Sequence, residues 1–160
     1  MKRTIQYLYI LIAAVLMSCG SEEEPKGFPV GNWKLSAIVF ENGPNSTELT
    51  SSRLNSFTIE FLSDGTAQSR ITQAEKTLNW TYESASGGLQ MSDGSNTEAY
   101  IVESSDNSEF RYQIADLSSM AAASVDQSAI AELAANTFNQ SKKSYDPSGA
   151  LKVYFKFEQQ

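Results

Sequence analysis

Histidine is absent from the 160 residues, and cysteine occurs only once. Without histidine the chain has no Ser-His-Asp or Cys-His catalytic group and no histidine-ligated zinc, copper or iron site. Positive charge is also scarce, because 12 lysines and arginines stand against 19 acidic residues and give a net charge of −7. That balance argues against nucleic acid and against polybasic contact with anionic lipids. We therefore expect a non-catalytic protein with no cofactor and no nucleic-acid partner.

The one cysteine, Cys19, follows a segment that has the parts of a signal peptide in their usual order. Residues 2–3 are positively charged, and residues 5–17 form an apolar run too short to span a bilayer comfortably. The sequence LMSCG at 16–20 resembles the lipobox of bacterial lipoproteins, although Met17 replaces the small residue usual at that position. The resemblance implies cleavage before Cys19 and acylation of its thiol, which anchors the protein to a membrane. A plain secretory signal with a chance cysteine is the alternative.

Cleavage would divide the chain into a signal peptide at 1–18, an acidic flexible tether at 19–27 and a single domain at 28–160. It would leave 142 of the 160 residues, with 10 of the 12 basic side chains against all 19 acidic ones, a charge of −9. With the thiol acylated no disulfide can form, so packing alone must stabilise the domain. The tether resembles the surface-export signal of Bacteroidota lipoproteins, which implies an outer-membrane protein facing the cell exterior. A solvated spacer with no routing role is the alternative.

The remaining sequence predicts an all-β domain. Short segments with apolar residues at alternate positions, separated by turn residues, predict antiparallel strands. The segments are 33–40, 57–61, 66–72, 77–83, 89–91, 98–103, 109–115 and 151–157. We expect a meander of eight strands that closes into a barrel, since closure removes the sheet edges. Residues 41–52 are expected to form a polar loop.

One region has the period of a helix instead. Apolar residues between 124 and 143 recur at helical spacing, and Ser124 with Gln127 resembles a capping box. Lys142 and Lys143 follow, where the helix dipole favours positive charge. We therefore expect one helix before the last strand.

Three short motifs resemble lipocalins. Gly31-Asn32-Trp33 is similar to their G-x-W motif, and the segment 57–66 is similar to the second strand and turn of lipocalin-like domains in bacterial lipoproteins. A tryptophan on a middle strand, Trp80, fits the same pattern. The resemblance implies an eight-stranded lipocalin-like barrel in which Trp33 packs across the closed end. The chain departs from the family in one respect, because only seven predicted strands precede the helix rather than eight.

A small barrel that holds a ligand would line it with aromatic side chains and a few polar groups. The candidate ligand-binding residues are Trp80, Tyr82, Tyr100, Tyr112, Phe57 and Phe61. We expect a small apolar or amphipathic ligand. The alternative is a filled barrel whose inward aromatics only pack, in a structural or interaction subunit that docks an envelope protein in an outer-membrane complex.

The charged residues form no motif. Arg70, Arg111 and Gln113 would orient an anionic ligand if they pointed inward, but alternation with Phe110 and Tyr112 directs Arg111 to solvent. Carboxylates occur singly on separate strands, at Glu60, Glu83, Glu98 and Glu103, and are expected on solvated faces. Residues 93–96 contain oxygen ligands but lack the pattern of a calcium loop, and are expected to form a turn. An enzyme that uses carboxylates or tyrosines is a third hypothesis.

Overall fold

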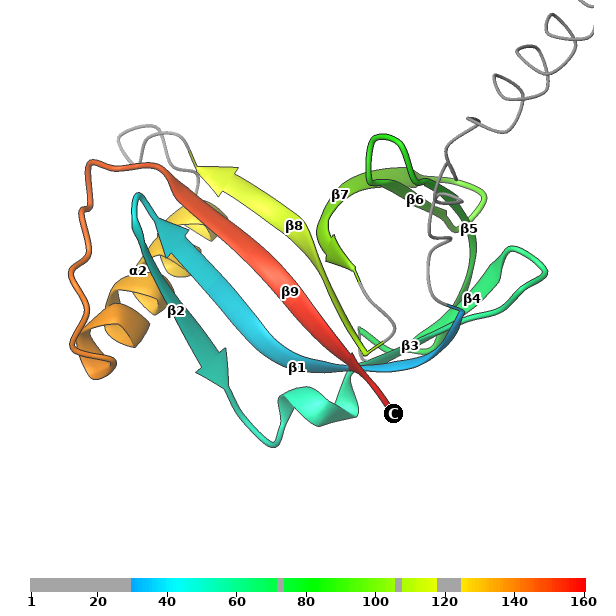
Figure 1. The fold of residues 1–160 in the computed structure, drawn as a ribbon, viewed down its shortest axis with the longest axis horizontal. Coiled ribbons are helices and arrows are strands. Elements are labelled where there is room, and N and C mark those ends of the chain that lie inside the picture. Colours follow the sequence, from blue (N-terminus) through cyan, green and yellow to red (C-terminus); the bar gives the residue numbers. More distant parts are fainter. Residues whose placement is uncertain (1–29, 72–73, 106–107, 118–124) are drawn as a thin grey trace, which may run out of the picture.

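The computed structural model describes residues 30–71, 74–105, 108–117 and 125–160 (Figure 1). The predicted signal peptide, Cys19 and the acidic tether lie outside these ranges. Within the described ranges, no helix is both long enough and apolar enough to cross a membrane.

The described chain is mostly antiparallel sheet, with one α-helix before the last strand, as predicted. The strands are β1 (Gly31–Asn42), β2 (Asn45–Thr50), β3 (Thr58–Phe61), β4 (Thr66–Ser69), β5 (Lys76–Glu83), β6 (Gly88–Ser92), β7 (Thr97–Ser105), β8 (Glu109–Leu117) and β9 (Leu151–Gln159). A 3-10 turn, η1 (Leu54–Ser56), precedes β3, and the helix α2 (Val125–Gln140) lies between β8 and β9.

Eight of these strands form a ring. From β3 to β9 each strand pairs with the next, β3 also pairs with β1, and β9 returns to pair with β1 from Trp33 to Asn42. The two ends of the ring differ and are named here. The mouth is the end at which β4, β6 and β8 terminate, and the packed end is the opposite one. Since neighbouring strands run in opposite directions, β5, β7 and β9 begin at the mouth.

The ninth strand, β2, shows that the prediction of a loop over residues 41–52 was wrong. The chain turns at Gly43, whose φ of 58° suits glycine, and β2 then pairs with β1 beside β3. Its sequence, NSTELT, has a single apolar residue, so apolar alternation could not reveal it. Tertiary contacts hold it instead: Thr47 is buried, and its hydroxyl lies 2.7 Å from that of Ser141. Eight strands therefore precede the helix, not seven.

The packed end is filled by large apolar side chains. Trp33 is fully buried, as the lipocalin resemblance implied, and meets Phe110 edge to face with ring centroids 4.9 Å apart. The ring centroids of Phe61 and Phe110 lie 6.0 Å apart, and the ring of Phe157 stacks on that of Phe110 with centroids 4.9 Å apart. These rings leave no exposed surface, and they anchor β1, β3, β8 and β9 to one another.

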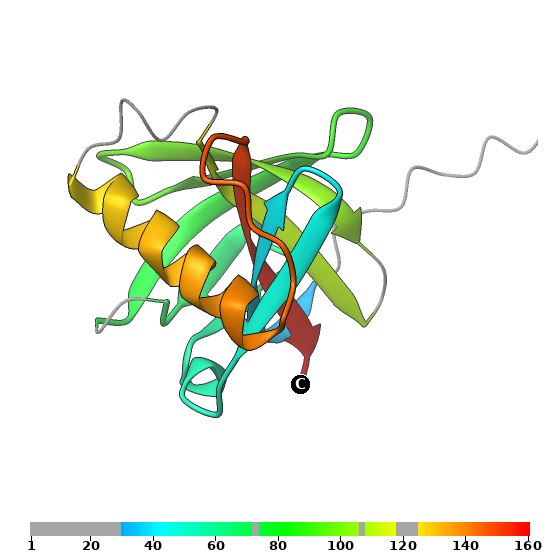
Figure 2. The ribbon, with the colours of Figure 1, turned by 90° about the vertical axis from the view of Figure 1, so that its left-hand side faces the viewer.

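The helix α2 lies across part of the mouth (Figure 2). Its buried side, with Ala131, Ala134 and Phe138, packs on residues from β1, β8 and β9. It ends at Gln140, earlier than expected, because Lys142 adopts the left-handed conformation with φ 55° and ends the helical hydrogen bonding.

A matched pair of substitutions on α2 tests this packing. Phe138 is fully buried, whereas Leu133 is 40% exposed on the same helix. We expect Phe138→Ala to lower the free energy of unfolding by about 3 kcal/mol through lost burial and the cavity it leaves. Leu133→Ala should cost less than about 1 kcal/mol, since alanine also favours helix. Urea unfolding measures both, and equal losses would contradict the packing.

Candidate functional site

A cavity of about 270 Å³ opens at the mouth of the ring. Its apolar wall comes from β5, β6, β8, β9 and the segment just after β4, and comprises Ile71, Leu78, Met91, Tyr112, Ile114 and Phe155. Its polar lining comprises Ser69, Lys76, Asp93, Asn96, Glu98 and Tyr100. The ring is therefore filled at one end and hollow at the other.

Strand register places these side chains on the inner face. Residues directly opposite each other in neighbouring strands share a face, and Leu78 pairs with Ala67, which is fully buried. In the same way Glu98 pairs with the buried Met91, and Tyr100 pairs with Leu89. The inner face of β7 thus presents both a carboxylate and a phenol to the cavity.

The cavity lies where the pairing between β7 and β8 ends. This ladder begins near the β7–β8 turn and stops at Val102 and Tyr112. Beyond that point residues 97–101 pair with β6 and residues 113–117 pair with β9, and β7 curves away from β8 (Figure 1). Side chains bridge the gap, because the rings of Tyr100 and Tyr112 lie 4.6 Å apart at 51°. The two strands therefore leave room for a cavity whose floor is aromatic.

Both tyrosines stay neutral at ordinary pH. Burial is the main cause that raises the pKa of Tyr112 far above its usual value, and the nearby Tyr100 and Glu98 add to it. Burial also raises the pKa of Tyr100, whose hydroxyl donates a hydrogen bond to the Glu98 carboxylate. The hydrogen-bonded carboxylate favours the protonated phenol, so Tyr100 remains a donor.

Three charged side chains line the cavity. The carboxylate of Asp93 accepts hydrogen bonds from the backbone N–H groups of Ser95 and Asn96 at 2.9 and 2.8 Å, which lower its pKa. The charge of Lys76 lowers that pKa further. As predicted, residues 93–96 form a turn, which Asp93 holds together. Across the described ranges, neither Lys76 nor Glu98 forms an ion pair within 4.0 Å.

Of the six residues predicted to bind a ligand, Tyr100 and Tyr112 line the cavity. Phe61 belongs to the packed end, and Phe57 and Tyr82 pack half-buried against the same core. Trp80 meets Phe61 at 5.3 Å, and its indole N–H donates to the carbonyls of Leu62 and Thr66 at 3.2 and 2.9 Å. These contacts give Trp80 a role in holding the β3–β4 turn.

Sequence reasoning missed most of the polar lining. Glu98 was placed on a solvated face, although it alternates with Tyr100 and therefore points to the same side of β7. Phe155 alternates with Val153 and Phe157, so its inward direction could be read from the sequence. Lys76 alternates with Leu78 in the same way, so its side of β5 could also be read, but not that this end of β5 becomes a cavity wall.

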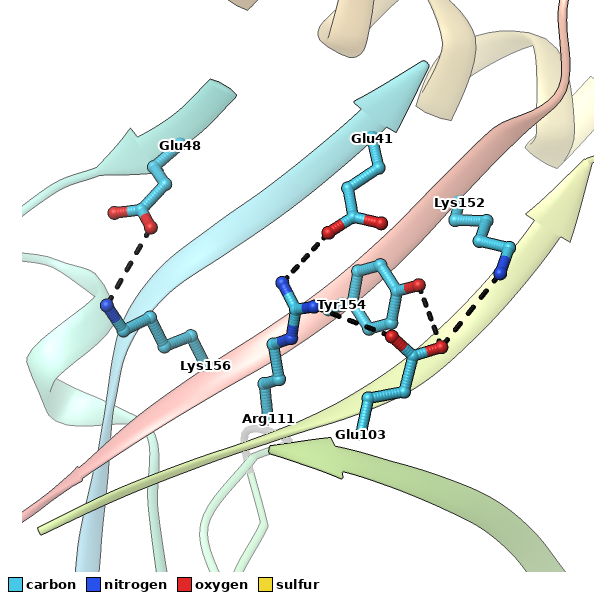
Figure 3. A network of polar contacts seen from close by, with 7 residues as sticks. All are labelled: Glu41, Glu48, Glu103, Arg111, Lys152, Tyr154 and Lys156. Carbon is cyan, nitrogen blue, oxygen red and sulfur yellow. Dashed lines mark hydrogen bonds and ion pairs between the residues drawn. The ribbon is translucent and has the colours of Figure 1, made fainter. Parts of the chain in front are cut away.

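The predicted outward direction of Arg111 is confirmed, and Figure 3 shows where it lies. Its guanidinium is 4.6 Å from the ring centroid of Tyr154, and it pairs with Glu41 at 2.9 Å and with Glu103 at 3.5 Å. Tyr154 is fully buried beneath it and donates a hydrogen bond to Glu103 at 3.0 Å. This outer-face network joins β1, β7, β8 and β9, which is a structural role.

The other polar candidates also lie away from the cavity. Arg70 pairs with Glu75 at 3.0 Å on the exposed surface. Gln113 lies opposite the outward-facing Tyr154 in the β8–β9 ladder. Neither residue can orient a ligand in the cavity.

Comparison with protein-family models, with curated proteins and with solved structures finds no match to this chain.

The burial of Tyr112 predicts an alkaline loss of stability. The unfolded chain releases the phenolic proton near the usual pKa of 10.0, whereas the folded state retains it. Below pH 10 the stabilisation that depends on the protonated Tyr112 is fully present. Above pH 10 the free energy of unfolding falls by up to about 1.4 kcal/mol per pH unit for this group. We expect Tyr112→Phe to make the fall between pH 10 and 11 shallower than in the wild type. Urea unfolding at each pH measures the slope, and parallel slopes would refute the effect.

Proposed function

We propose that the protein is a lipid-anchored lipoprotein of the outer membrane, facing the cell exterior. Its domain would be a lipocalin-like barrel that binds a small apolar or amphipathic ligand. The observation that carries the proposal is the cavity at the mouth, unfilled beside a packed end. The membrane anchor rests on the signal-peptide pattern and on Cys19.

The size and lining of the cavity limit the ligand. Ligand sites of drug-like molecules usually enclose about 300–1,000 Å³, so a cavity of about 270 Å³ suits a smaller molecule. At about 30 Å³ per water molecule in the liquid, it holds roughly nine waters. Apolar contact with Leu78, Met91 and Phe155 would drive binding, at about 25 cal/mol for each Å² removed from water. A polar group on the ligand would remain near the lining charges.

A filled barrel that serves as a subunit of an outer-membrane complex is the second candidate. The packed end favours it, because Trp33, Phe61 and Phe110 leave that half of the ring without space. The mouth favours the binding function. We also propose that the role is non-catalytic, since the lining holds two neutral phenols, single charges and the Ser69 hydroxyl, and among the described residues that hydroxyl has no hydrogen bond to a basic side chain.

Filling the cavity tests the binding function. We expect small amphipathic aromatic compounds to bind the wild-type domain, with the heat of binding measured by titration calorimetry. Leu78→Trp places an indole in the lining and should weaken binding at least tenfold. Ile101→Trp, at a site 57% exposed on β7, is the matched control and should bind as the wild type does.

Calorimetry suits this test better than tryptophan fluorescence, because neither Trp33 nor Trp80 lines the cavity. A panel of small apolar, amphipathic and charged compounds that all fail to bind the wild type would refute the binding function.

Substitution of the lipidated residue tests the anchor. We expect Cys19→Ala to move the protein from the membrane fraction to the soluble fraction, since no acyl chains would then be attached. A variant with Glu22, Glu23 and Glu24 all changed to Ala should stay in the membrane fraction but lose accessibility to protease in intact cells. Cys19→Ala protein that remained in the membrane would contradict the lipobox assignment.

A further inference from the structure

We propose that the ligand is a small organic cation, an amine with an apolar body whose ammonium group binds at Glu98 in the cavity. This inference rests on the proposed binding function and specifies the chemical class of the ligand.

Glu98 has the position and the free capacity to bind an ammonium group. Its side chain lines the cavity from the inner face of β7, between the apolar wall and solvent. The Tyr100 hydroxyl donates one hydrogen bond to it. A carboxylate offers about four acceptor sites, so it can accept further hydrogen bonds from a ligand.

The aromatic floor also favours a cation over an anion. Tyr100 and Tyr112 lie 4.6 Å apart, and Phe155 meets Tyr112 at 6.1 Å, so three rings surround one side of the cavity. Ring faces attract cations through their quadrupole and repel anions.

One lining residue opposes a cation, namely Lys76. Two carboxylates, Asp93 and Glu98, stand against it in the lining, and the charge of Lys76 is one of the smaller causes that lower the pKa of Asp93. One positive and two negative side chains leave the lining with a net charge of −1, which favours a cation. The net charge of −7 over the whole chain also favours the approach of cations.

The test uses three ligands with the same aromatic body: 2-phenylethylamine, 3-phenylpropionate and the neutral 3-phenylpropanol. Each is titrated into the wild-type protein, Glu98→Gln and Lys76→Met by calorimetry. Glu98→Gln has nearly the same shape, can still accept the Tyr100 hydrogen bond and lies at an exposed site, so the fold should survive. Lys76→Met is the matched removal of the opposite charge.

We expect the amine to bind the wild type about tenfold more tightly than the carboxylate, and added salt to weaken its binding. Glu98→Gln should weaken the amine about tenfold and leave the alcohol unchanged, whereas Lys76→Met should not weaken the amine.

Tighter binding of the carboxylate, or an equal affinity of all three compounds, would overturn the cation inference while the cavity stayed a binding site. An amine affinity that Glu98→Gln left unchanged would overturn it as well. If none of the three compounds bound, both the inference and the binding function would be contradicted for ligands of this size.

Discussion

The return of β9 to β1 is the pairing on which the other features of the domain depend. It joins the last strand to the first over most of the length of both, and β8 pairs with the other edge of β9. Without it, the strands would form an open sheet that exposes one edge of β1 and one edge of β9. With it, the inner faces of eight strands surround a common interior, and the helix before β9 is held at the mouth.

The two ends of the ring then differ because their side chains and their pairing differ. At the packed end, the rings of Trp33, Phe61 and Phe157 meet around Phe110 and exclude space. At the mouth the β7–β8 ladder stops at Tyr112, and α2 covers only the part formed by β1, β8 and β9. The cavity is the part of the mouth that neither α2 nor the β7–β8 pairing closes. Its lining combines apolar side chains with charged ones.

Much of this could be predicted from the sequence, and the failures have physical causes. Alternation of apolar residues located the eight strands of the ring and the helix, because one buried face leaves that pattern. It missed β2, whose stability comes from pairing with β1 and from Ser141 rather than from its own apolar residues. It identified Tyr100 and Tyr112 as inward aromatics, but it could not separate them from Phe61 and Trp80, which only pack.

The sequence by itself determined the class of fold, the faces of the strands and the absence of histidine and disulfide chemistry, because these depend only on residue types and their local spacing. Tertiary structure alone decided which inward residues line a cavity. That choice depends on where the β7–β8 pairing ends and on how much of the mouth α2 covers. Both follow from contacts between residues far apart in the chain, such as Phe138 with the strands of the ring, and no local pattern encodes them.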